Sequence, residues 1–196
     1  MITSLPKLTT EFIAQILPNE SNAKRVDEQR KDFYLRSYPA IIEIARSKTL
    51  NTETRLLQLA CATYGWMPRI RISVWLELNI DEIAAIQSHE AACKSIEKLK
   101  VPTINNSWVG TSKMLHFINP KHFPIWDSRI AGTLFGEGTN ANSKKRYQEY
   151  CKKIQAWNEE DAQYGVPLAN AIEKKYHYKP NNLRCIELAL FSMSKG

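Results

Sequence analysis

The stretch VGTSKMLHFINPKHFPIWDSRIAG, residues 109 to 132, predicts two helices joined by a connection that is not helical. The first helix carries Lys113 near its start. Pro120 and Pro124 stop this helix, because proline has no amide hydrogen and its ring clashes with the preceding turn. Asp127 is the candidate N-cap of the next helix, since its carboxylate can accept from the first backbone amides. A lysine and an aspartate are therefore expected at the starts of two successive helices.

Helical periodicity extends through the rest of the chain, and no stretch alternates apolar and polar residues over more than a few positions. We therefore predict an all-α fold, divided by prolines, glycines and capping residues. The expected helices are 8–17, 22–37, a helix opened by Pro39, one from about 51 to Gly65, a short segment from Pro68 to Trp75, 81–100, the Lys113 helix, the helix after Asp127, 143–164, 167–178, and a last helix beginning at Asn181 or Asn182.

The domain organisation follows from chain length and from the absence of repeats and clear linkers in the sequence. The 196 residues can bury a core as a single all-helical domain, residues 1–196. The alternative is two small helical lobes around a cleft, with residues 50–135 as one lobe and residues 1–49 plus 136–196 as the other. The polar turn TINNSWVG precedes the Lys113 helix and predicts a compact helix-hairpin-helix element there.

The composition indicates an ordinary globular protein with a basic surface. Lysine and arginine outnumber aspartate and glutamate by 27 to 20, a net charge of +7, which favours a polyanionic partner such as nucleic acid. The basic clusters around residues 94–100 and 144–153 are equally compatible with solvated helix faces. No apolar run is long enough for a membrane span, and the N-terminus lacks a secretory pattern, so a cytoplasmic location without membrane attachment is expected.

The cysteines are scattered and none forms a CxxC pair or lies at metal-ligand spacing from a histidine. We therefore expect reduced thiols, no metal and no cofactor.

Lys113 and Asp127 are the residues whose pairing points to chemistry. The positive end of a helix dipole disfavours an ammonium group, so a lysine in a first turn is expected to have a lowered pKa. A neutral amine of this kind is what Schiff-base formation requires, and a nearby carboxylate could stabilise developing positive charge. The structural alternatives are a surface lysine whose stem covers Trp108 and an aspartate that only caps its helix.

The order of these elements resembles the helix-hairpin-helix DNA glycosylases, the superfamily of the 8-oxoguanine and endonuclease III type enzymes. The shared features are a helix, a hairpin containing glycine (Gly110), a helix with a lysine near its start, and a proline-rich connection to an Asp-capped helix, here PIWDSRI. The resemblance implies that Lys113 attacks the deoxyribose C1′ and that Asp127 assists departure of the base. It covers about 30 to 35 residues, and the single hairpin glycine, where the family has two, favours a non-catalytic relative.

A DNA-binding site follows from this resemblance. Backbone amides of the hairpin and the basic helix after it would bind phosphates, and an extruded base would lie between aromatic side chains. The expected nucleic-acid contacts are Trp108, Gly110, Thr111, Ser112, Arg129, Lys144, Lys145 and Arg146, and the expected base pocket is Trp66, His122 and Trp126.

Three of the polar and aromatic side chains have structural alternatives. Trp66 is also compatible with core packing. His116, on the same helical face as Lys113, is expected to be a hydrogen-bonded structural histidine. For Glu187, on the otherwise apolar last helix, we favour a buried ion pair with Arg184 or Arg69 over a contact to the extruded base.

Two functions are therefore expected. The first is a DNA glycosylase-like protein that excises or recognises a modified base, with Schiff-base lyase chemistry as an option. The alternative is a non-catalytic component that binds nucleic acid or an operon-encoded partner, because small proteins of similar sequence look like components of bacterial anti-phage defence.

Overall fold

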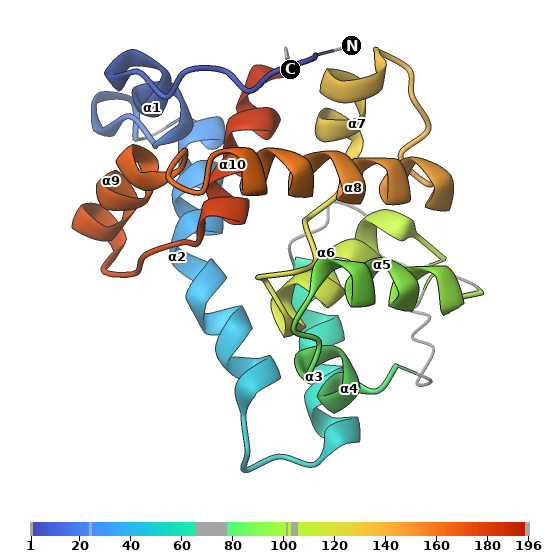
Figure 1. The fold of residues 1–196 in the computed structure, drawn as a ribbon. Helices are drawn as coiled ribbons and strands as arrows, with labels where there is room; N and C mark the ends of the chain where they lie inside the picture. Colours follow the sequence, from blue (N-terminus) through green and yellow to red (C-terminus); the bar gives the residue numbers. More distant parts are fainter. Residues whose placement is uncertain (1, 24, 66–77, 101, 103–105, 195–196) are drawn as a thin grey trace.

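The computed structural model describes residues 2–23, 25–65, 78–100, 102 and 106–194. All regular secondary structure in these ranges is helical, which confirms the all-α prediction (Figure 1). No helix among the described residues has the length and apolar character needed to cross a membrane. The expected segment from Pro68 to Trp75 lies outside the described residues.

The N-terminal part consists of α1 (Thr10–Ile16), the short 3-10 helix η1 (Glu20–Asn22), α2 (Val26–Arg46) and α3 (Thr52–Gly65). Figure 1 shows α2 running the length of the molecule before the chain turns back into α3. The expected division of α2 before Pro39 is wrong, because Pro39 lies inside a continuous helix. Residues on both sides of the proline, Leu35 and Tyr38 before it and Ile41 after it, are buried. Packing of this face offsets the single amide hydrogen bond that proline removes.

The expected helix 81–100 is two helices, α4 (Ile80–Ala84) and α5 (His89–Lys98). Ser88 separates them: its backbone is extended, and its hydroxyl oxygen accepts from the Ala91 amide at 3.2 Å. The single helix was therefore a wrong prediction. The helical spacing of apolar residues continues across the break, which is why a single helix was predicted. The N-cap preference of Ser88 nevertheless starts a new helix there.

The C-terminal part consists of α6 (Trp108–Ile118), α7 (Ser128–Phe135), α8 (Lys144–Glu160), α9 (Val166–Tyr176) and α10 (Asn182–Met193). Asp127 caps α7, as predicted, and α10 begins at Asn182, one of the two predicted starts, with Asn181 as its cap. The connection between α5 and α6 lies partly outside the described residues, so the helix-hairpin-helix element stays a prediction.

Helix α6 lies at the centre of the core. Apart from Val109, every residue of the helix is buried, and α6 contacts α2, α3 and α4. Helix α10 packs against α7 and α8 on the other side. The larger hydrophobic cluster takes residues from both of the lobes considered above, and a smaller one joins parts of α1, α2, α9 and α10. This arrangement places Lys113 and most of the α6–α7 connection in the interior, with Asp127 partly exposed at its end.

Candidate functional site: a buried amine and carboxyl pair

The connecting segment, residues 119–127, is a mostly buried non-helical stretch between α6 and α7. Buried backbone groups need hydrogen-bond partners, and side chains of the surrounding helices provide them. Three carbonyl groups of the segment accept hydrogen bonds: Phe123 from His116 Nδ1 at 2.7 Å, Pro124 from the Tyr147 hydroxyl at 3.3 Å, and Pro120 from Asn181 Nδ2 at 2.9 Å. The Trp126 amide donates to Ser112 Oγ at 3.0 Å. Glu187 accepts from the Ile125 amide. These contacts fix the path of the segment, and therefore the position of Asp127.

Ser112 makes two contacts with Trp126 that are closed to solvent. Its hydroxyl oxygen is the acceptor for the Trp126 amide at 3.0 Å and lies 3.1 Å from the Trp126 carbonyl. The side chain of Ser112 is therefore directed at the connecting segment, and it holds α6 to the residue just before Asp127.

We expect Ser112→Ala to lower the free energy of unfolding by about 1–3 kcal/mol, because the Trp126 amide would lose its partner in the interior. Ser95→Ala is the matched control, since the Ser95 hydroxyl donates to the helical carbonyl of Ala92 at a partly buried site; its effect should be below about 0.5 kcal/mol. Urea unfolding followed by circular dichroism measures both. Equal effects of the two substitutions would contradict this role of Ser112.

Lys113 is buried, with 9% of its surface exposed. Helix α6 begins at Trp108 and is capped by Ser107, so Lys113 lies in its second turn and not in the first turn as predicted. The pKa of the Lys113 amine is lowered, and burial is the main cause; Asp127 opposes the shift and Arg184 adds to it. The alternative of a surface lysine over Trp108 is wrong because Lys113 is buried.

Asp127 is the other member of the pair. Its carboxylate accepts from the Ile130 amide at 2.9 Å as the N-cap of α7. Burial raises the pKa of this carboxyl group, while the Ile130 amide and the Lys113 charge partly offset the shift. The side chain is partly exposed. The structure therefore brings Lys113 and Asp127 close enough to act on each other's ionisation, in a setting that disfavours both charges.

The lowered pKa of Lys113 has a measurable consequence for stability. Between its folded pKa and the ordinary value of 10.5, the unfolded chain binds the extra proton, so stability rises with pH in that window. We expect the stability of the wild type relative to Lys113→Met to increase from neutral pH toward about pH 10.5. Urea unfolding of both proteins at several pH values tests this. A difference independent of pH would show that Lys113 titrates normally.

A second buried polar cluster supports the pair. Arg184 donates to Glu187 at 2.9 Å, which confirms the predicted ion pair, and its guanidinium lies 4.9 Å from the centre of the Tyr38 ring. Arg69, the other predicted partner, lies outside the described residues. His116 is hydrogen-bonded to the Tyr38 hydroxyl at 2.9 Å and to the connecting segment, so the structural interpretation of this histidine is confirmed.

The sequence did not predict that Arg184 lies near Lys113. It was recognised only as a partner for Glu187, and its charge adds to the lowering of the Lys113 pKa. The available signal was an arginine on a helix that is otherwise apolar on nearly all sides, because a buried arginine needs charged partners.

The residues that precede Lys113 and were predicted to bind nucleic acid lie in the interior of the protein. Trp108 is almost fully buried, and Thr111 and Ser112 are fully buried. The Gly110 amide donates to Ser107 Oγ at 3.3 Å, and the Thr111 amide to the Ser107 carbonyl at 2.9 Å. These amides are thus occupied by the helix and its cap, unlike the free amides expected of a hairpin.

The predicted basic contacts lie nearer the surface, and two arginines stack on aromatic rings. Arg129 lies 4.7 Å from the centre of the Phe191 ring, and Arg146 is at the same distance from Phe135. Arg146 also pairs with Glu149 at 2.8 Å. Both side chains are therefore held in place by packing as well as by charge.

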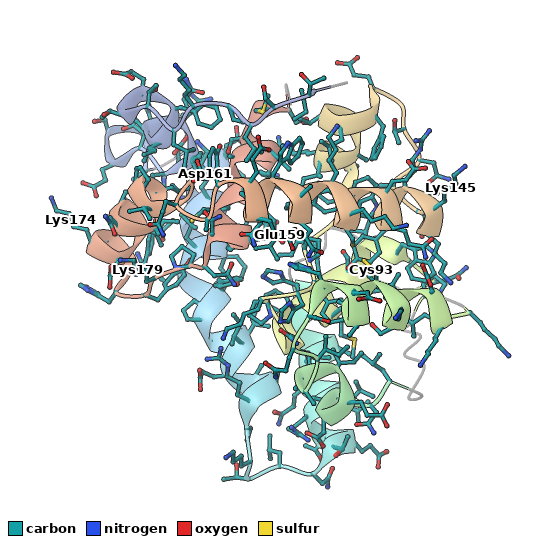
Figure 2. All side chains as sticks on the ribbon, viewed as in Figure 1. Cys93, Lys145, Glu159, Asp161, Lys174 and Lys179 are labelled. Atoms are coloured by element: carbon teal, nitrogen blue, oxygen red, sulfur yellow. The ribbon has the colours of Figure 1, made fainter. Side chains whose placement is uncertain are left out.

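Lys144 and Lys145 differ in role at the start of α8. The Lys144 amine donates to the carbonyls of Glu97 and Leu99 at the end of α5, at 2.9 and 2.7 Å, so it joins the two helices. Lys145, the second residue of α8, is exposed (Figure 2). Lys145 therefore offers its charge to a partner more freely than Lys144 does.

Two of the three predicted base-pocket residues, Trp126 and His122, lie among the described residues. Trp126 is fully buried, its indole nitrogen donates to the Ala141 carbonyl at 2.6 Å, and its ring lies 5.3 Å from that of Tyr150. The His122 ring packs against His89. Trp66 lies outside the described residues. The pocket assignment of all three stays a prediction, and the contacts of Trp126 are those of a core residue.

Comparisons with known proteins give no family for the chain. No protein-family model matches the sequence, and neither the curated proteins nor the solved structures yield a significant match.

Proposed function

We propose that this chain is a DNA glycosylase-like protein in which the Lys113 amine attacks the deoxyribose of a modified nucleotide and Asp127 assists. The observation that carries the proposal is the buried pair itself: an amine and a carboxyl group, each with its charged form disfavoured by burial, acting on each other. A neutral amine supplies the lone pair that nucleophilic catalysis needs. The resemblance of the surrounding sequence to helix-hairpin-helix glycosylases supports DNA as the substrate.

The chemistry assigns one role to each group. The lone pair of the Lys113 amine forms a bond to C1′ as the bond to the base breaks, and the departing base takes up a proton. Loss of the amine proton and opening of the sugar ring then give an imine. The Asp127 carboxylate stabilises the positive charge that develops on the sugar. Because Asp127 is partly exposed while Lys113 is buried, a substrate would approach from the Asp127 side.

Binding to a polyanion is supported by charge. The chain carries a net charge of +7, and Arg129, in the first turn of α7, follows Asp127 by two residues. Phosphate groups near Asp127 would therefore meet the Arg129 guanidinium.

Borohydride trapping tests the proposal. Duplexes carrying 8-oxoguanine, uracil or an abasic site are incubated with the protein and sodium borohydride, which reduces an imine to a stable covalent adduct. We expect an adduct with the wild type and with Lys174→Ala, a control that removes an exposed lysine of α9 outside the predicted nucleic-acid contacts, and its loss in Lys113→Ala and Lys113→Met. Circular dichroism verifies folding of each variant. Equally little adduct from the wild type and the Lys113 variants on every duplex would overturn the enzymatic proposal.

A second function, nucleic-acid binding without catalysis, is favoured by a different observation. The Gly110 and Thr111 amides are occupied, and Trp126 is sealed in the core. Such a protein would hold DNA through its basic surface and extrude no base. We expect its affinity for a fluorescent duplex to fall steeply with salt, because each phosphate contact releases counterions. Lack of binding at low salt would remove both nucleic-acid functions.

A further inference from the structure

Two basic segments that are distant in the sequence are brought together where α5 packs against α8 (Figure 1). At the start of α8, the Lys144 amine donates to the carbonyls of Glu97 and Leu99 at the end of α5. Residues 90–100 and 143–153 carry eight basic and three acidic side chains, which accounts for five of the seven excess positive charges of the chain. Tertiary packing therefore concentrates most of the net charge on one part of the molecule.

Several of these basic side chains are exposed and are not neutralised by an acidic neighbour. Lys94 pairs with Glu90 at 2.6 Å, and Arg146 pairs with Glu149 at 2.8 Å. Four other exposed lysines form no ion pair with any residue that the structure describes, and together we call them the α5–α8 basic surface: Lys98, Lys100, Lys145 and Lys152. Their charges are therefore available to an external anion.

The charges on α8 are arranged against the dipole of the helix. Its first turn begins with Lys144, Lys145 and Arg146 and contains no acidic residue. Its last turn contains Glu159 and Glu160 and no basic residue, and Figure 2 shows Lys145 and Glu159 toward opposite ends of the helix. The positive end of a helix dipole disfavours cations and the negative end disfavours anions, so this order of charges lowers the stability of α8. Departures of this kind from the stabilising arrangement are expected at functional surfaces.

Lys144 has a positioning role within this region. Its ammonium group satisfies two carbonyls at the end of α5, where a cation also complements the helix dipole. It lies 5.7 Å from the centre of the Trp108 ring at the start of α6. Lys144 therefore holds the start of α8 beside the end of α5, and it keeps the lysines of the two helices on one continuous surface.

We propose that the α5–α8 basic surface binds the phosphate backbone of duplex DNA. The inference rests on the nucleic-acid part of the proposed function and not on the imine chemistry. Packed helices lie about 8–10 Å apart, so the lysines form two rows at a separation similar to the width of the DNA major groove, about 12 Å. Each row can then contact one of the two phosphate strands that border the groove. Phosphate contacts carry no base information, so this binding is independent of sequence.

Fluorescence anisotropy with a labelled, undamaged duplex at several salt concentrations tests the surface. The variant Lys98→Gln with Lys145→Gln removes one charge from each row. The control, Lys174→Gln with Lys179→Gln, changes the net charge equally, but its two exposed lysines lie on the opposite side of the molecule from Lys145 (Figure 2). We expect weaker binding by the first variant, with a slope of log K against log salt that is smaller by about 1.8, or 0.9 for each lost phosphate contact. The control should keep the wild-type slope, and circular dichroism verifies folding of both.

The possible results separate this surface from the proposed chemistry. If both double variants weaken binding equally, only net charge matters, and the α5–α8 basic surface is overturned while DNA binding stands. Binding of a single strand but not of the duplex would overturn it as well. A wild type that binds neither at low salt would remove the surface together with both nucleic-acid functions. Duplex binding that depends on Lys98 and Lys145, without any borohydride adduct, would support the surface and contradict the enzymatic proposal alone.

Discussion

Glu187→Ala is expected to cost about 3–5 kcal/mol of folding stability, the range for breaking a buried ion pair by removing one partner. The Glu187 carboxylate pairs with Arg184 at 2.9 Å, lies 3.3 Å from His116 Nδ1 and accepts from the Ile125 amide. Its removal leaves a buried guanidinium without its carboxylate and an internal amide without its acceptor. Urea unfolding at pH 7 measures the loss.

Two controls separate the charge from the packing. Glu90→Ala removes a carboxylate from an exposed pair with Lys94, and exposed pairs contribute about 0–1 kcal/mol. The double variant Arg184→Met with Glu187→Leu removes both charges, so it should be more stable than Glu187→Ala. A loss with Glu187→Ala that is no larger than with Glu90→Ala would contradict the role assigned to Glu187.

Acid should weaken the same interaction. Burial alone would raise the pKa of Glu187, but His116 and Arg184 outweigh it, and the pKa is lowered from its ordinary value of 4.5. A carboxyl group with a lowered folded pKa contributes stability above its unfolded pKa, and this contribution is lost as pH falls through the folded value. The stability difference between the wild type and Glu187→Ala should therefore shrink below about pH 4.5.

Asp127→Ala is the second substitution with a large expected effect. It removes the cap of α7, which contributes about 1 kcal/mol, and it also leaves the buried Lys113 amine without the carboxylate that favours its charged form. We expect a loss of stability clearly greater than that of a cap alone. Asp127→Asn keeps a capping side chain and removes only the charge, so its effect should be intermediate.

A double-mutant cycle with Lys113→Met measures the coupling directly. If the two groups interact, Asp127→Ala should cost less in the Lys113→Met background than in the wild type, because no amine is left unpaired. Urea unfolding of the four proteins at pH 7 gives the coupling free energy. An equal cost of Asp127→Ala in both backgrounds would show that Asp127 acts only as a cap.

The helical part of the fold was largely accessible from local signals, and the errors have a common cause. Asp127 was correctly predicted as a cap, and the start of α10 was predicted to within one residue, because capping depends on a few neighbouring residues. Pro39 was predicted to begin a new helix, but burial on both sides of it keeps α2 continuous. At Ser88 the opposite occurred, because a local cap divided a helix whose apolar spacing continued. Local preferences are worth about 1 kcal/mol each, so the packing that surrounds them decides the outcome.

The sequence by itself determined the helical class of the protein, the Asp127 cap and the identity of the two groups that form the pair. Only the tertiary structure decided that Lys113 is buried, that burial is the main cause of its lowered pKa, and that Arg184 lies near it. The same holds for the meeting of His89 and His122. Helix formation and capping depend on neighbours along the chain, whereas desolvation and charge proximity depend on which distant segments pack together.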